Sequence, residues 1–323
     1  MSLLNVSGIS KKQGEEFVLK NINFIQESLQ RIAIAGSTGS GKTTLLKIIA
    51  GFIQPDAGEV LFEGARVKGP LEKLLPGHSL IAYLSQNFEL RNNYRVEELL
   101  QMANKFSNSD ADLVFEVCRI GHLLNRWSDE LSGGERQRIA FAKALITAPK
   151  LLLLDEPFSN LDAIHRNILK TVINDIEERL NTSCILVSHD PVDSLSWADE
   201  IIVLHKGKIV QRSAPEEIYT HPVNEYVAAL FGKFNLVSPE LIQLFPSLKN
   251  DGRKFVRPGD FQLSDNGSGV KGEVLSSSFM GNYFETDVNI SGHCLTITLP
   301  QKFKVGETIF LSVKAQEQRH HLE

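Results

Sequence analysis

Cysteine is scarce in this sequence, and the few cysteines are poorly placed for a shared role. Cys118, Cys184 and Cys294 are an odd number, lie far apart and form no CxxC pair. This spacing argues against a disulfide framework and against a zinc site, and it favours a reducing, intracellular compartment.

Long apolar stretches and an excess of positive charge are also missing. The longest apolar runs, such as Leu151 to Leu154 and Ile201 to Leu204, fall far short of the ~20 residues that span a bilayer. No basic-then-apolar signal peptide opens the chain, which is expected to be soluble by itself. The net charge is −5, so no nucleic-acid partner is expected. Of the 323 residues 42% are hydrophobic, enough for one large domain and a smaller one.

Strand and helix patterns alternate through the first two thirds of the chain. Residues 3–9 and 17–26 predict strands, and 44–52 predict a helix. Between residues 89 and 129 the apolar spacing turns helical, with helices expected over 96–106 and 110–124. After Lys150, strands and helices alternate again, which predicts a parallel sheet with helices on its faces.

The C-terminal part has a different residue pattern. Its short strand-like runs are separated by Gly, Asn and Asp, which predicts a small β-barrel. These runs are Phe261 to Leu263, Glu273 to Leu275, Phe284 to Ile290, Leu295 to Leu299 and Thr308 to Val313. Residues 233–254 are expected to be a linker, and 316–323 a tail, partly a cloning remnant, that carries no function.

A glycine-rich loop follows the strand pattern that ends near Ala35. Its full phosphate-loop motif predicts a nucleotide site made of Gly36, Ser37, Thr38, Gly39, Ser40, Gly41, Lys42, Thr43 and Thr44. Backbone N–H groups and the next helix N-terminus would hold the phosphates of ATP. Lys42 would lie on the β- and γ-phosphates, and the Thr43 hydroxyl on Mg²⁺.

Two acids end the apolar run Leu151 to Leu154. Asp155 can hold Mg²⁺ through water, as the strand-end aspartate does in phosphate-loop enzymes. Glu156 can polarise the attacking water, a role typically worth ~10²–10⁴ in rate. A phosphate loop alone does not distinguish kinases, GTPases and motors, and the acidic pair adds a place for Mg²⁺ and for a base that activates water.

The segment Leu131-Ser132-Gly133-Gly134-Glu135-Arg136-Gln137 stands just before an expected helix that runs through Leu145. It is similar to the signature motif of ABC ATPases, a resemblance that covers about residues 1 to 232. The resemblance implies head-to-tail homodimers, in which each ATP lies between one subunit's phosphate loop and the Ser132, Gly133 and Gly134 of the other. Ser132 would cap its helix and face the γ-phosphate.

The same resemblance implies roles for three further residues. Gln86 would sense Mg²⁺ and the attacking water, beside a loop that touches a membrane partner. Asp162, in Ser159-Asn160-Leu161-Asp162, would cross the dimer interface. His189 would be the switch histidine that hydrogen-bonds the γ-phosphate.

One position departs from the family. Gln13 stands where an aromatic residue usually stacks on adenine, and Phe17 is an alternative. The C-terminal part resembles the TOBE-type β-domain of import ATPases through Val256-Arg257-Pro258-Gly259-Asp260, Gly272-Glu273-Val274, Met280-Gly281 and Val305-Gly306-Glu307. An unrelated β-domain that stabilises the dimer is the other interpretation.

The expected fold class is therefore α/β: a P-loop ABC ATPase domain (1–232) with a helical subdomain at about 89–145, plus a small OB/TOBE-like β-domain (255–315). The main functional hypothesis is the ATP-hydrolysing subunit of an importer, cytoplasmic and peripheral on the inner face of the membrane. Its partners would be a second copy, integral permease subunits and, indirectly, an extracytoplasmic substrate-binding protein. The alternatives are a soluble ABC ATPase of translation or DNA repair and a ligand-sensing module. An exporter is disfavoured because no membrane domain is fused. Sugars, polyamines, sulfate-like anions and ferric iron all stay open as substrates.

Overall fold

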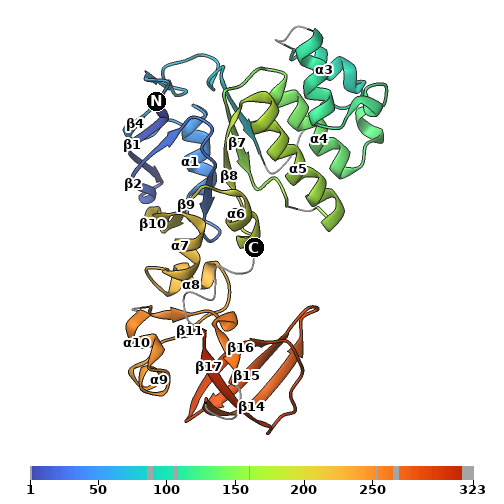
Figure 1. Ribbon diagram of the computed structural model, residues 1–323. Helices are drawn as coiled ribbons and strands as arrows, with labels where there is room; N and C mark the ends of the chain where they lie inside the picture. The colour runs from blue at the N-terminus through green and yellow to red at the C-terminus, as the bar shows by residue number, and fades with distance from the viewer. Residues whose placement is uncertain are drawn as a thin grey trace. The chain divides into compact units, whose positions relative to one another are not determined.

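The computed structural model of the chain describes residues 2–85, 90–104, 108–159, 161–251, 253–264 and 269–314. The chain forms two compact units, Met1–Pro215 and Glu216–Glu323 (Figure 1). Each unit has a hydrophobic core of its own. In the described parts, no helix has both the length and the apolar composition that crossing a membrane requires.

The first unit opens with an antiparallel sheet in the order β2-β1-β4-β5. Its strands are β1 (Ser2–Gln13), β2 (Glu16–Glu27), β4 (Ala57–Phe62) and β5 (Ala65–Arg66). The hairpin of β1 and β2 pairs Gln13 with Glu16 and Lys12 with Phe17. The strands predicted over 3–9 and 17–26 are confirmed, and both extend further than the alternation indicated.

A mostly parallel sheet forms the centre of the first unit, in the order β10-β9-β3-β8-β7-β6. Its strands are β3 (Ile32–Ala35), β6 (Ile81–Leu84), β7 (Leu151–Asp155), β8 (Ser183–Val187), β9 (Glu200–His205) and β10 (Lys208–Ser213). The pair β9–β10 is antiparallel and the other pairs are parallel. The parallel sheet predicted from the alternating pattern is confirmed.

Helices cover both faces of this central sheet (Figure 1). They are α1 (Lys42–Ile49), α4 (Gly133–Leu145), α5 (Ala163–Leu180) and α6 (Pro191–Trp197). In β7, Leu151 and Leu153 belong to the core that contains α1, whereas Leu152 and Leu154 belong to the core that contains α4 and α5. Because successive side chains of a strand point to opposite faces, α1 and α4 lie on opposite sides of the sheet.

The chain between β6 and β7 is helical. Besides α4 it contains α2 (Val96–Gln101), α3 (Asn108–Val117) and the 3₁₀ turns η1 (Gly121–Leu123) and η2 (Ser128–Glu130). The helices predicted over 96–106 and 110–124 are shorter than expected. After α3, Arg119 takes a left-handed conformation with φ 55°, which closes the helix.

The second unit is built on a curled antiparallel sheet in the order β13-β17-β14-β15-β16. Its strands are β13 (Phe261–Leu263), β14 (Val270–Phe279), β15 (Phe284–Ile290), β16 (His293–Leu299) and β17 (Thr308–Val313). A small pair, β11 (Asn235–Leu236) and β12 (Phe255–Val256), and the 3₁₀ turn η3 (Pro258–Asp260) accompany it. The predicted small β-domain is confirmed as a half-barrel of OB/TOBE-like form.

The region expected to be a linker is folded. Its helices α9 (Pro239–Leu244) and α10 (Ser247–Asp251) bury Leu241 and Leu248 in the core of the second unit. The helices before it, α7 (Pro215–Thr220) and α8 (Glu225–Leu230), are bound to buried Arg257, which donates hydrogen bonds to the backbone carbonyls of Tyr219 and Ala228. These contacts explain why the compact units divide at residue 215, whereas the sequence suggested a boundary after Gly232.

Candidate active site

The glycine-rich loop lies between β3 and α1, with Lys42 as the first residue of the helix. Gly41 caps the helix at φ 104°, and a Cβ at this position would lie 2.7 Å from the Val18 carbonyl oxygen. Both the positive φ and the close approach of β2 require glycine. The loop therefore has the tight turn that its motif predicted.

Lys42 is only 6% exposed, and its ammonium closes the loop on itself. Nζ donates hydrogen bonds to the carbonyl oxygens of Gly36 (2.8 Å) and Ser37 (3.0 Å). Burial lowers the pKa of Lys42, and the negative charges of Glu156 and Asp155 oppose that effect. The ammonium is thus held beside both acids that end β7.

Asp155 joins the loop to the central sheet. Its Oδ1 accepts a hydrogen bond from the Thr43 hydroxyl (3.1 Å), and its Oδ2 accepts one from the Tyr83 hydroxyl (2.8 Å). Burial raises the pKa of Tyr83, and the Asp155 carboxylate raises it further, so the phenol keeps its proton and donates. No role for Tyr83 was predicted, because its partner is 72 residues away and the β6–β7 pairing is what brings the two together.

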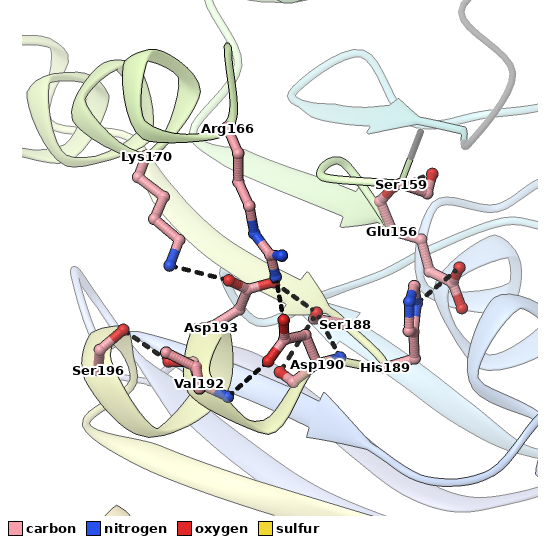
Figure 2. A network of polar contacts seen from close by, with 10 residues as sticks. All are labelled: Glu156, Ser159, Arg166, Lys170, Ser188, His189, Asp190, Val192, Asp193 and Ser196. Atoms are coloured by element: carbon pink, nitrogen blue, oxygen red, sulfur yellow. Dashed lines mark hydrogen bonds and ion pairs between the residues drawn. The ribbon is translucent and has the colours of Figure 1, made fainter. Parts of the chain in front are cut away.

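Glu156 adopts a left-handed backbone conformation with φ 52°. Such strain in a residue other than glycine costs about 1–3 kcal/mol and gathers at functional sites. Its backbone N–H donates to the Val187 carbonyl (2.9 Å), which fixes the turn after β7. The side chain then reaches His189, whose Nδ1 lies 3.3 Å from Glu156 Oε2 (Figure 2).

These residues fit a nucleotide with a magnesium ion. The Thr43 hydroxyl and the Asp155 carboxylate are the hard oxygen donors that Mg²⁺ prefers, and Mg²⁺ usually takes one or two protein oxygens together with phosphates and water. Ser40 Oγ is buried and has no hydrogen-bond partner within the described structure, so it is free to receive or donate one in the loop.

The signature segment belongs to the opposite face of the sheet. Ser132 caps α4: its Oγ accepts from the Glu135 N–H (3.3 Å), and Glu135 Oε2 accepts from the Ser132 N–H (2.8 Å). This is the predicted cap in the form of a capping box. Gln137 is buried and donates to the carbonyl of Pro157, so α4 is bound to the residue that follows Glu156.

Asp162 caps the neighbouring helix, α5. It accepts a hydrogen bond from the His165 N–H (2.9 Å) and contacts His165 Nδ1 (2.7 Å). Backbone and side chain of His165 together lower the pKa of Asp162. The His165 ring in turn lies against Gly134, where an added Cβ would be 2.4 Å from its Cδ2. Gly134 of the signature segment and Asp162 of the predicted interface loop therefore both lie against His165 within one chain.

Two residues of the predicted site, Gln86 and Asn160 of the predicted interface loop, lie outside the described residues.

A cavity beside Gly39 is lined by Gln13 and Phe17 among others. The Phe17 side chain is exposed, and Lys12 Nζ lies 4.8 Å from the centre of its ring.

Comparisons with known proteins agree with this geometry. Residues 19–159 match the family model described as ABC transporter. A spermidine/putrescine import ATP-binding protein, PotA of Clostridium acetobutylicum, is 30% identical over 96% of this chain and 94% of its own length. The glucose import ATP-binding protein GlcV of Saccharolobus solfataricus is 36% identical over 80% of this chain and 78% of its own. The sulfate/thiosulfate import ATP-binding protein CysA of Mesostigma viride is 31% identical over 98% and 97%.

Solved structures share the fold. The structure of cbiO1 from Clostridium perfringens, part of an ABC transporter complex, has a TM-score of 0.60 and 24% identity, and it covers 67% of this chain and 90% of its own. A dimeric ATP-binding cassette bound to ADP and phosphate has a TM-score of 0.56 and 24% identity, covering 66% and 98%. Nothing in these comparisons supports a role in translation or DNA repair. Sequence, geometry and relatives agree: the chain belongs to the ABC transporter family, as one of its ATP-binding subunits, and is an ATPase.

Proposed function

We propose that two copies of this chain bind two ATP molecules head to tail and power an importer through a separate membrane permease. One observation carries the composite site. The phosphate loop begins α1 on one face of the central sheet, and Ser132 begins α4 on the other. A phosphate held by one chain's loop therefore meets the signature segment of a second chain.

The surface around the signature segment supports this arrangement. Ser132, Gly133 and Asp162 are exposed, and the apolar side chain of Ile164 is 71% exposed beside Asp162. A partner that covers this isoleucine would gain apolar burial. The solved dimeric cassette with ADP and phosphate is an example of such pairing in a protein of the same fold.

Within each site the residues divide the chemistry. Lys42 and the loop N–H groups would hold the phosphates, and Thr43, Asp155 and Gln86 would hold Mg²⁺, which would neutralise charge on the transferred phosphoryl group. Glu156 would take the proton of the attacking water, and His189 would bind the γ-phosphate. The base would lie in the cavity beside Gly39, where Phe17 offers an aromatic face that Gln13 lacks.

The import function follows from the relatives, which are named as import ATP-binding proteins and match almost the whole chain. The chain would then lie on the cytoplasmic side of the membrane, attached through its permease, and would act indirectly on cargo brought by a substrate-binding protein. The named relatives import a polyamine, a sugar or an oxyanion, so the cargo has to be identified through the permease.

The substitution Glu156→Gln tests the catalytic assignment. It should leave ATP binding intact and reduce turnover by about 10²–10⁴-fold, because the water loses its general base. The variant should then accumulate as an ATP-bound dimer, detectable by sedimentation velocity with and without ATP. Glu178→Gln, a change of an exposed carboxylate on α5, is the matched control and should keep wild-type turnover. Wild-type turnover in Glu156→Gln would remove this role.

The partner is tested with the same variant. Tagged Glu156→Gln protein is captured from detergent-treated host membranes with ATP, and in parallel without it, and co-purifying proteins are identified by mass spectrometry. A stoichiometric multi-span membrane protein supports the importer, and its identity narrows the cargo. Reproducible capture of soluble proteins alone would contradict it.

A further inference from the structure

A cluster of charged side chains next to His189 has no role in the site described so far. Arg166 and Lys170 project from α5 toward Asp190 and Asp193, which lie at the start of α6 (Figure 2). Arg166 Nη2 donates to both carboxylates, at 2.6 Å to Asp193 Oδ2, and Lys170 Nζ lies 2.9 Å from Asp193 Oδ1. We call Arg166, Lys170, Asp190 and Asp193 the α5–α6 clamp.

The clamp fixes the backbone on both sides of His189. On one side, the Ser188 hydroxyl donates to Asp193 Oδ2 (2.9 Å). On the other, the Asp190 N–H donates to Ser188 Oγ (3.1 Å), and Asp190 Oδ1 accepts from the Val192 N–H (2.9 Å) to cap α6. The residues before and after His189 are thus tied to one another and to α6.

His189 itself has little packing to orient it. Its side chain is 64% exposed, and its Nδ1 lies 3.3 Å from Glu156 Oε2. A held backbone fixes the point from which the ring extends, and from that point the ring can reach Glu156 with less loss of conformational entropy than from a mobile backbone. The position of the ring therefore depends on the clamp.

Within the α5–α6 clamp, Arg166 is the residue that binds both carboxylates, those of Asp190 and Asp193. The Asp193 side chain is 1% exposed, and a buried carboxylate without a partner is strongly unfavourable. Asp190 and Asp193 would also repel each other if the guanidinium that binds both were missing. Without Arg166, Asp193 still contacts Lys170 and the Ser188 hydroxyl, but the ion pair that ties the Asp190 carboxylate to α5 is lost, so the turn beside His189 is held less firmly.

We propose that Arg166 is a positioning residue for ATP hydrolysis, which acts through Asp190 and Asp193 to hold His189 at Glu156. This rests on the proposed role of His189 at the γ-phosphate. The guanidinium of Arg166 binds the carboxylates of Asp190 and Asp193 and lies 5.9 Å from the centre of the Phe158 ring, and no contact with the phosphate loop is seen in the described part of the chain. It therefore affects the rate of the chemical step and not the affinity for nucleotide.

The test compares Arg166→Met with Arg31→Met in the full chain. Both arginine side chains are 29% exposed and each binds a buried carboxylate, Asp193 or Glu177, but Arg31 precedes β3 at the end remote from the phosphate loop. Arg166→Met should lower kcat about tenfold or more, since small misplacements of catalytic groups have effects up to 10²-fold, with KM for ATP changed less than about twofold. Arg166→Lys should recover part of kcat. Arg31→Met should lower Tm by about as much as Arg166→Met does, but should keep the wild-type kcat.

Two further variants make the result decisive. If Arg166 acts through His189, the double variant Arg166→Met/His189→Ala is no slower than His189→Ala, because the second change removes what the first one positions. A double variant whose loss of kcat equals the product of the two single losses would overturn the proposal. Wild-type kcat in a folded Arg166→Met variant would overturn it as well. If Arg166→Met does not fold, Asp193→Asn, which keeps the shape and weakens the clamp, must lower kcat in the same way or the proposal fails. Wild-type kcat in His189→Ala would overturn the role of His189 itself, and this inference with it.

Discussion

At the scale of single residues, Glu177 gives the clearest dependence on pH. Its carboxylate on α5 is 5% exposed and is paired with Arg31. Burial raises its pKa from 4.5 to about 7, against the opposing charge of Arg31. Between these two values the folded state holds a proton that the unfolded state has lost, so the free energy of unfolding decreases as pH rises from 4.5 through 7.

The substitution Glu177→Gln should remove this dependence. From pH 5 to pH 8 the wild-type chain should lose about 3 kcal/mol of unfolding free energy relative to the variant, at 1.36 kcal/mol for each unit of pKa shift. Urea unfolding at several pH values without nucleotide measures the difference. Glu59→Gln, a change of an exposed carboxylate on β4, is the control and should follow the wild-type curve. Parallel curves for wild type and Glu177→Gln would show that Glu177 titrates alike in both states.

Residue by residue, the sequence was informative where a motif is local. Lys42 and Thr43 follow one glycine loop, and Asp155 and Glu156 end one apolar strand, so a short pattern suffices for each and the structure brings them together. Tyr83 was missed for a physical reason. Its contact with Asp155 depends on which strands are neighbours in the sheet, and an alternating pattern contains no information about strand order.

At the scale of elements, α4 and α5 meet at the signature segment. Gly134 lets the two helix starts approach, since a Cβ there would lie 2.4 Å from His165 Cδ2, whereas Gly133 has open space. Gly134→Ala should therefore destabilise the chain by about 1 kcal/mol, because the 40% exposed His165 ring has to rotate away from Asp162. Gly133→Ala should be neutral or stabilising by up to about 1 kcal/mol, because alanine favours the helix.

The clash predicts a specific rescue. In Gly134→Ala/His165→Ala the ring is gone, so most of the lost stability should return, while His165→Ala in the Gly133→Ala background should show no such recovery. Thermal and urea unfolding of the nucleotide-free chain measure all four variants. A stabilised Gly134→Ala would contradict the close approach of the two helices.

Helices and strands with a clear periodic pattern of apolar residues were predicted better than short ones without such a pattern. The strand-like runs predicted for β15 and β17 have the ends that the structure shows. Residues 233–254 were expected to be a linker, because α9 and α10 are too short to show a helical repeat. What makes them part of the second unit is burial of Leu241, Phe245 and Leu248 in a core formed by strands that come later in the sequence.

At the scale of the whole molecule, the proposed head-to-tail arrangement predicts how two chains form a dimer with ATP. Ser132 is exposed at the start of α4, so Ser132→Arg should cost about 1 kcal/mol of stability through the lost helix cap, leave nucleotide binding intact and put a bulky charge where a partner's phosphate would lie. In the Glu156→Gln background, this change should abolish the ATP-dependent dimer in sedimentation velocity. A persisting dimer would mean that the interface lies elsewhere.

Mixing two inactive chains tests the geometry more sharply. Ser132→Arg has an intact phosphate loop and a damaged signature, and Lys42→Ala has the reverse. Neither homodimer contains an intact site, but a head-to-tail mixed dimer contains one, so an equal mixture should recover up to about a quarter of wild-type turnover. If each chain instead used its own loop and signature, every site in the mixture would stay damaged and no turnover would return. Because α1 and α4 are on opposite faces of one sheet, recovery on mixing is the outcome that the fold predicts.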